Sequence, residues 1–185
     1  MIKDIIKSRR SIRKFKNIAI NPNDLKDLIE AGSYAPSGAN TQCQRFVVTT
    51  NNDDIEYMGI NRTKYFKTCK AIIICFADWS VCWNNYPEKS KFFPNLPYWD
   101  CGASIQNILL LAEEKLLSTC WISMHPEMKC MKWINETFNI PESYEVMGSI
   151  AIGYADEQVN YENDLHQKRP IKRKEVKDYI FNWRA

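Results

Sequence analysis

The sequence of 185 residues lacks the short motifs that identify many enzyme classes. It has no GxGxxG or GxxxxGKS/T loop, so neither a Rossmann dinucleotide site nor a P-loop is indicated. It has no GxSxG elbow and only two histidines, which argues against a hydrolytic triad. HExxH and CxxC pairs are also missing. The evenly spaced Cys120, His125 and Cys130 would straddle a strand, a turn and a helix, so we favour buried thiols and a turn histidine over a metal site.

The sequence also has only a small excess of basic over acidic residues. The 25 basic and 22 acidic residues give a formal net charge of +3, which does not require a nucleic-acid partner but allows a local anion site. No apolar run is long enough to span a membrane, and the opening residues 1–7 are charged and helix-like rather than typical of a secretory signal. The seven cysteines are an odd number without paired spacing, which fits a reducing compartment. We therefore expect a cytoplasmic protein with neither nucleic acid nor membrane as partner.

Hydrophobic periodicity predicts a single domain, residues 1–185, in which helices and strands are interspersed. Helices are predicted at 2–8, 22–32, 55–67, 100–115, 126–138 and 174–181, and strands at 45–50, 71–77, 119–123 and 149–154. The apolar run 71–77 is typical of a central strand that is covered on both faces. This pattern predicts an α/β or α+β sandwich. The last segment has no obvious core of its own, so we expect it to wrap onto another body, such as a second subunit.

The clearest candidate binding feature lies near the start of the chain. Arg9, Arg10, Ser11 and Arg13 place three guanidinium groups and a hydroxyl within five residues, and we call residues 9–13 the arginine segment. Guanidinium forks bind phosphate oxygens in pairs, and the serine hydroxyl adds a donor. Ile12 and Phe15 could anchor the segment to a core. A solvated basic stretch is the alternative, and it applies equally to the second basic run, residues 168–174.

A second candidate feature is rich in turn residues and amides. Residues 36–42, which we call the amide loop, combine backbone freedom at Gly38 with the amide side chains of Asn40 and Gln42. Amides both donate and accept hydrogen bonds, which suits the mixed edge of a planar heterocycle. An ordinary turn between a helix and a strand is the alternative.

Taken in chain order, these motifs resemble the nitroreductase-like flavoproteins. The resemblance is carried by residues 9–15, 35–42, 102–110, 119–122 and 152–154, and it covers most of the chain. It implies an α+β sandwich with a central mixed sheet flanked by helices, and a homodimer with FMN at the subunit interface and an extended C-terminal segment. It also implies an FMN-dependent oxidoreductase that passes electrons from NADH or NADPH to a nitroaromatic, a quinone or a similar small acceptor.

The resemblance also implies which residues contact the cofactor. Those expected to hold the phosphate and ribityl end are Arg9, Arg10, Ser11 and Arg13, with Arg169 from the C-terminal segment. Those expected to line the ring are Pro36, Ser37, Gly38, Asn40 and Gln42. Asn61 and Lys64 would touch its pyrimidine edge, and Ile122, Ser123 and Met124 would pass beside it near N5. No side chain is expected to be catalytic, because the flavin is the reactive group.

Several positions depart from the family pattern and leave the substrate open. Cys43-Gln44 stands where Pro-Trp is common, and Ser118 and Ser123 stand where glycines are common. A flavoprotein with another reaction, flavin-consuming or substrate-oxidising, is therefore an alternative. A basic protein that binds RNA or anionic membrane is a further one, which the interleaved acids and the small net charge disfavour. The aromatic, proline-rich stretch 79–99 is expected to be either a lid that stacks flat substrates or a packing element.

Overall fold

The computed structural model describes residues 1–82, 91–156, 173 and 175–180. It divides the chain into two compact units, Met1–Ala155 and Asp156–Ala185, which are described separately. The described part of the second unit contains η5, a 3-10 helix at Val176–Asp178, with a capping box between Glu175 and Asp178. This is shorter than the predicted helix 174–181, of which residues 174 and 181 lie outside the described residues.

The first unit is built on a four-stranded sheet with the strand order β1-β2-β4-β3. The strands are β1 (Gln44–Thr49), β2 (Ala71–Asp78), β3 (Ser118–Ile122) and β4 (Tyr144–Gly153). All eight residues of β2 are buried, and β2 pairs with a strand on either side, which confirms the predicted central strand.

The expectation of a mixed sheet is wrong for the described residues, because every neighbouring pair of strands is antiparallel. The connection from β2 through a long helix to β3 does return β3 in the direction of β2, as a helical crossover predicts. However, β4 lies between the two strands and pairs antiparallel with both. Parallel pairing is limited, in the part of the chain that the structure describes, to one isolated bridge between Ser11 and Thr119.

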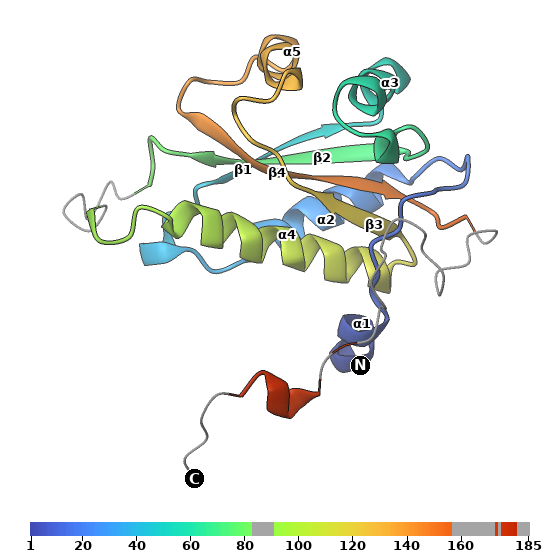
Figure 1. Ribbon diagram of the computed structural model, residues 1–185, viewed down its shortest axis with the longest axis horizontal. Helices are drawn as coiled ribbons and strands as arrows, with labels where there is room; N and C mark the ends of the chain where they lie inside the picture. The colour runs from blue at the N-terminus through green and yellow to red at the C-terminus, as the bar shows by residue number, and fades with distance from the viewer. Residues whose placement is uncertain (83–90, 157–172, 174, 181–185) are drawn as a thin grey trace. The chain divides into compact units, whose positions relative to one another are not determined.

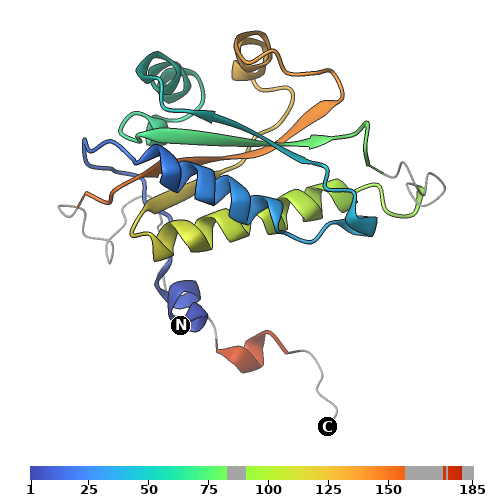
Figure 2. The ribbon, with the colours of Figure 1, turned by 180° about the vertical axis from the view of Figure 1, so that it is seen from behind.

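Helices cover both faces of the sheet (Figures 1 and 2). One face carries α2 (Pro22–Ser33) and α4 (Leu96–Glu114), and the other carries α3 (Asn52–Asn61) and α5 (Cys130–Thr137). The rings of Tyr57 on α3 and Trp133 on α5 stack with their centroids 4.0 Å apart. Shorter elements are α1 (Ile2–Ser8), η1 (Gly38–Asn40) and η2 (Lys64–Phe66). Among the described helices, none combines the length and apolar character that a membrane crossing requires.

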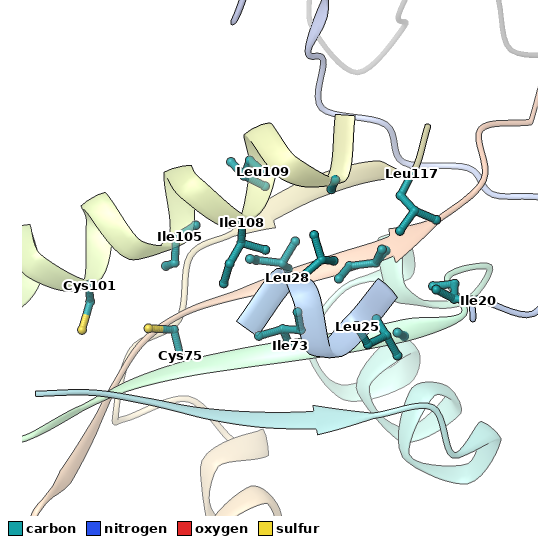
Figure 3. Close-up of a cluster of buried hydrophobic side chains, with 14 of the residues drawn as sticks. Ile20, Leu25, Leu28, Ile73, Cys75, Cys101, Ile105, Ile108, Leu109 and Leu117 are labelled. Carbon is teal, nitrogen blue, oxygen red and sulfur yellow. The ribbon is translucent and has the colours of Figure 1, made fainter. Parts of the chain in front are cut away.

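The main core lies between the sheet and the α2–α4 pair. Figure 3 shows Leu28 of α2 and Ile105 and Ile108 of α4 facing Ile73 of β2. All four side chains are fully buried. Each such side chain contributes about 1.5–3 kcal/mol by leaving water, so this layer fixes α4 as a rigid support.

Several element boundaries differ from the predicted ones. Helix α4 begins at Leu96 rather than at residue 100, because Pro97 occupies the first turn, where the missing N–H costs nothing. Helix α5 begins at Cys130 rather than at residue 126, and the predicted helix 55–67 is two elements, α3 and η2. Strand β4 begins five residues earlier than predicted, at Tyr144.

Candidate functional site

The arginine segment is fixed along the edge of the sheet. The N–H of Ile12 donates to the carbonyl of Thr119 (2.8 Å), and the N–H of Lys16 donates to the carbonyl of Tyr154 (2.8 Å). Ile12 and Phe15 are buried, which confirms that they anchor the segment. Ile12 points inward, whereas the neighbouring Ser11 and Arg13 are half-buried.

The arginines of this segment are not equivalent. Nη1 of Arg10 donates to the carbonyls of Arg9 (2.9 Å) and Ser8 (3.1 Å), so this exposed side chain caps the end of α1. Arg13 is half-buried, and its guanidinium carbon lies 5.3 Å from the centre of the Tyr65 ring. This cation–π contact directs Arg13 toward the segment that holds Asn61 and Lys64.

Arg62 joins two of the predicted contact segments. Its Nη2 donates to the carbonyl of Ser123 and lies 3.4 Å from the hydroxyl oxygen of the same residue. The structure thus brings residues 61–64 beside residues 122–124. Arg62 itself was not among the predicted site residues, although it lies between Asn61 and Lys64. Its Nε is buried with no hydrogen-bond partner among the described residues.

The amide loop has a left-handed backbone at several positions. Ala39, Asn40 and Gln42 have φ values of 50°, 54° and 49°. The loop is closed by the hydroxyl of Ser37, which accepts a hydrogen bond from the N–H of Gln42 (2.9 Å). Gly38 packs so closely on α4 that an added Cβ would lie 1.9 Å from Leu96 Cδ2. The loop therefore presents the amides of Asn40 and Gln42 at the surface, where both side chains are exposed.

Asp100, in the first part of α4, holds the amide loop in place. Its Oδ2 accepts a hydrogen bond from the N–H of Gly38 (3.0 Å) and lies 4.0 Å from the sulfur of Cys43. The side chain is buried, and burial raises the pKa of the carboxyl, an effect that the Gly38 hydrogen bond partly offsets. Sequence reasoning missed this role, because the contact joins residues 62 positions apart.

The predicted contact residues fall into two groups. The amide loop contacts α4 at its start, through Leu96 and Asp100, whereas the arginine segment is tied to Thr119, beyond the end of α4 (Figure 1). An α-helix of 19 residues is about 28 Å long, so the two groups lie near opposite ends of one long helix.

The individual placements are as follows. Half-buried are Arg9, Ser11, Arg13, Ser37 and Gly38; exposed are Arg10, Pro36, Asn40, Gln42, Asn61, Lys64 and Ser123; buried are Ile122 and Met124. Arg169 lies outside the described residues, as does most of the second basic run.

The aromatic stretch is partly packed. Trp79 Nε1 and the Tyr98 hydroxyl both donate to the carboxylate of Glu145, and the two rings meet edge to face. Phe92 and Trp99 are exposed, and residues 83–90 lie outside the described residues. The packing role is thus observed for Trp79 and Tyr98, and the lid stays a prediction.

Comparisons with known proteins agree with this architecture. The model of the nitroreductase family matches residues 6–71 and 61–154. A protein of Archaeoglobus fulgidus named "Putative NADH dehydrogenase/NAD(P)H nitroreductase" is 30% identical over 163 residues, which cover 86% of this chain and 89% of that protein. The chain therefore belongs to the nitroreductase family.

Solved structures share the fold. An FMN-dependent nitroreductase from Clostridium difficile superposes with a TM-score of 0.68 at 27% identity, over 89% of this chain and 93% of the other. A Bacteroides fragilis nitroreductase with bound FMN gives a TM-score of 0.72 at 21% identity, over 100% of this chain and 98% of the other. The α+β nitroreductase-like fold inferred from the sequence is thus confirmed.

Proposed function

We propose that this protein is an FMN-dependent oxidoreductase that takes electrons from NADH or NADPH and delivers them to a small acceptor such as a nitroaromatic or a quinone. The observation that carries the proposal is that a nitroreductase-family fold holds both predicted contact groups: the amide loop contacts the start of α4, and the arginine segment is hydrogen-bonded to β3 just beyond the end of α4. The names of the similar proteins, which include FMN and NAD(P)H, support the same assignment.

The residues present suit FMN. A phosphate needs cationic and neutral donors, and Ser11 and Arg13 flank the buried Ile12 on a segment that is hydrogen-bonded to the sheet. A flavin ring edge needs donors and acceptors, which the exposed amides of Asn40 and Gln42 supply. The buried Nε of Arg62 adds a donor with no partner among the described residues. Each part of the cofactor thus has a chemically matched group.

When bound, FMN supplies the redox chemistry, accepting a hydride from the nicotinamide and passing electrons to the acceptor. The chain's own residues bind and orient. Arg13 and Ser11 would fix the phosphate, and the exposed cation of Lys64 would favour the negative charge that reduction leaves on the ring. Arg62 would hold the backbone at Ser123 in place beside the ring.

The separation of the two groups supports a homodimer. If both groups hold one FMN, the amide loop of one chain must meet the arginine segment of another, and a two-fold axis that sets two α4 helices side by side would achieve this. A hollow of about 810 Å³ is lined by residues of α1, of α2 and its C-terminal end, and of α4; the apolar ones include Ile2, Tyr34 and Leu111, and the charged ones include Asp27, Glu30 and Glu114. Ile2 and Tyr34 are exposed in the single chain, as residues of a subunit interface would be.

Absorption spectroscopy tests the assignment directly. The protein incubated with FMN and gel-filtered should show a flavin spectrum that bleaches with NADH or NADPH and returns when a nitroaromatic or a quinone is added. A protein that retains no flavin would refute the proposal. Retained flavin that neither nucleotide reduces would favour the substrate-oxidising alternative.

A pair of matched variants tests the phosphate site. Arg13→Ala removes a charge-assisted contact, whose loss of about 1.5–3 kcal/mol corresponds to roughly 10–100-fold weaker FMN binding. Lys14→Ala removes the same charge from the exposed neighbouring position and should leave the Kd of FMN nearly unchanged. Equal effects of the two variants would show that net charge alone attracts the cofactor.

Mixing two variants that bind FMN more weakly tests the shared site. Arg13→Ala damages the arginine segment and Asn40→Ala damages the amide loop. After unfolding and refolding the two variants together, each mixed dimer should contain one intact site, so that FMN binding and reductase activity reappear. Activity that stays at the level of the separate variants would show that each chain builds its own site.

A further inference from the structure

One arginine is hydrogen-bonded to the backbone where the amide loop runs into β1. Nη1 of Arg45, the second residue of β1, donates to the carbonyl of Gln42 (2.7 Å) and to the carbonyl of Gln44 (3.0 Å). The donors of a guanidinium group point in fixed directions within one plane. The two carbonyls are therefore held at set positions by a single rigid group.

A buried carboxylate in turn fixes this guanidinium group. Nη2 of Arg45 lies 3.2 Å from Oδ2 of Asp78, the last residue of β2. The other oxygen of Asp78, Oδ1, accepts hydrogen bonds from the N–H of Ser80 (3.0 Å) and from the hydroxyls of Ser80 (2.6 Å) and Ser143 (3.2 Å). Because the carboxylate is held on both oxygens, the direction of the Arg45 side chain is set by the end of the central strand.

The charge of Arg45 is compensated within this ion pair. The side chain of Asp78 is only 7% exposed, so its attraction for the guanidinium group is weakly screened by water. A cation that is paired in this way adds little to the attraction of a phosphate. The influence of Arg45 on the candidate site must therefore pass through the backbone that it holds.

The backbone of Gln42 needs such support. Its φ of 49° lies in the left-handed region, which is unfavourable for a residue with a Cβ. The N–H of Gln42 donates to the hydroxyl of Ser37 (2.9 Å), and its carbonyl accepts from Arg45. Both backbone polar groups of Gln42 are thus engaged, one on each side of its Cα, and together they set the direction in which its exposed side chain leaves the loop.

We propose that Arg45 is a positioning residue of the candidate cofactor site, which fixes the backbone of Gln42 so that the Gln42 side-chain amide meets the edge of the flavin ring. Arg45 acts through Gln42 and does not itself touch the cofactor. This inference rests on the proposed function, in which Gln42 lines the ring, and it adds the residue that orients this contact.

A double-mutant cycle on the Kd of FMN, measured by quenching of flavin fluorescence, tests the proposal. Gln42→Ala removes the amide but keeps a Cβ, and the loss of a neutral hydrogen bond should raise the Kd about 2–10-fold. Arg45→Ala should raise the Kd by a similar or smaller factor, because it can disturb only what Gln42 contributes. The double variant should therefore bind FMN no more weakly than Gln42→Ala alone.

Two further measurements separate positioning from a general loss of stability. The absorption bands of bound FMN report hydrogen bonds to the ring, and they should shift in the same direction in Arg45→Ala and in Gln42→Ala. Hydrogen exchange of the flavin-free protein should be faster at the N–H of Gln42 in Arg45→Ala than in the wild type. Lys26→Ala, which removes an exposed cation of α2, is the control and should change neither measurement.

Arg45→Lys provides a second variant in case the loss of the cation opposite the buried Asp78 prevents Arg45→Ala from folding. Lysine keeps this charge, but its ammonium group lacks the planar fork that joins Asp78 to the two carbonyls. The Kd of FMN should again rise, by a smaller factor, and the increase should again disappear in the Gln42→Ala background.

The inference is overturned if the effects of Arg45→Ala and Gln42→Ala multiply in the double variant, if either variant binds FMN as the wild type does, or if exchange at Gln42 is unchanged. A wild-type protein that retains no FMN contradicts the proposed function, and this inference falls with it. A wild type that binds FMN, with Arg45 variants that bind it equally well, contradicts this inference alone.

Discussion

The buried carboxyl of Asp100 gives the sharpest test of how the amide loop is held. We consider two substitutions, Asp100→Asn and Asp100→Ala. In the wild type the N–H of Gly38 donates to Asp100 Oδ2 (3.0 Å). Asparagine keeps a carbonyl oxygen that can accept this hydrogen bond, whereas alanine has no acceptor. Both variants are uncharged, so the difference between them reports the lost acceptor. An unpaired, part-buried N–H costs about 1–3 kcal/mol, and we expect Asp100→Ala to unfold more easily than Asp100→Asn by that amount.

The wild type should differ from Asp100→Asn in a pH-dependent way. Burial raises the pKa of Asp100 above its ordinary value of 3.8, so the folded state binds this proton more tightly than the unfolded chain does. The resulting stabilisation is present below pH 3.8 and is lost as the pH rises through the raised pKa. Asparagine does not titrate. The free energy of unfolding of Asp100→Asn relative to wild type should therefore increase with pH and then level off.

Urea unfolding followed by tryptophan fluorescence, at several pH values, measures these differences. The alanine variant should also melt lower than the asparagine variant, by about 2–4 °C per kcal/mol for a chain of this size. Asp53→Asn, which removes an exposed carboxylate of α3, is the control for loss of a charge without loss of a buried hydrogen-bond acceptor. The reasoning fails if Asp100→Asn is as unstable as Asp100→Ala, or if the stability of Asp100→Asn relative to wild type does not change with pH.

Two further substitutions test the framework around the site. In Gly153→Ala the new Cβ would lie 2.8–2.9 Å from Phe15, which is buried, so we expect a loss of about 1–3 kcal/mol in urea unfolding; an unchanged midpoint would show that Phe15 can move aside. Lys115→Met removes ion pairs to Asp24 (2.8 Å) and Asp27 (2.6 Å) that link the end of α4 to α2. Hydrogen bonds to these two aspartates raise the pKa of Lys115. We expect a lower Tm whose difference from wild type shrinks at high salt, and a salt-independent difference would mean that the ion pairs are not its cause.

Local sequence patterns predicted correctly those helices and strands that are determined by residues close together in the chain. The run 71–77 is apolar at every position, and its strand is buried throughout. The predicted helix 22–32 is observed as α2, and the side chain of Asn21, which directly precedes it, accepts a hydrogen bond from Asn23 N–H (3.0 Å), as an N-cap residue does. These local patterns do not depend on residues far away in the sequence, so the tertiary contacts do not change the predicted element.

The features that sequence reasoning missed depend on distant partners. Strand β4 begins at Tyr144 because Glu145 and Val146 pair with the end of β2, about 70 residues earlier in the chain. Arg62 is hydrogen-bonded to Ser123, which lies 61 positions later in the chain, and Asp100 to Gly38, which lies 62 positions earlier. Neither contact has a periodic signature. The sequence pointed to the two candidate contact segments, but it could not show which residues hold them in place or that they lie near opposite ends of α4.

Two of the positions that depart from the family pattern directly follow the amide loop. Cys43 and Gln44 are both buried, and neither Oε1 nor Nε2 of Gln44 has a hydrogen-bond partner among the described residues. A buried, unpaired amide weakens the fold locally, and the left-handed φ values of Ala39 and Asn40 add strain to the same loop. The loop therefore depends for its shape on Asp100, on the Ser37 hydroxyl and on the close packing of Gly38 against Leu96. A loop that is hydrogen-bonded to one carboxylate of α4 can change its geometry without any change in the core that supports it.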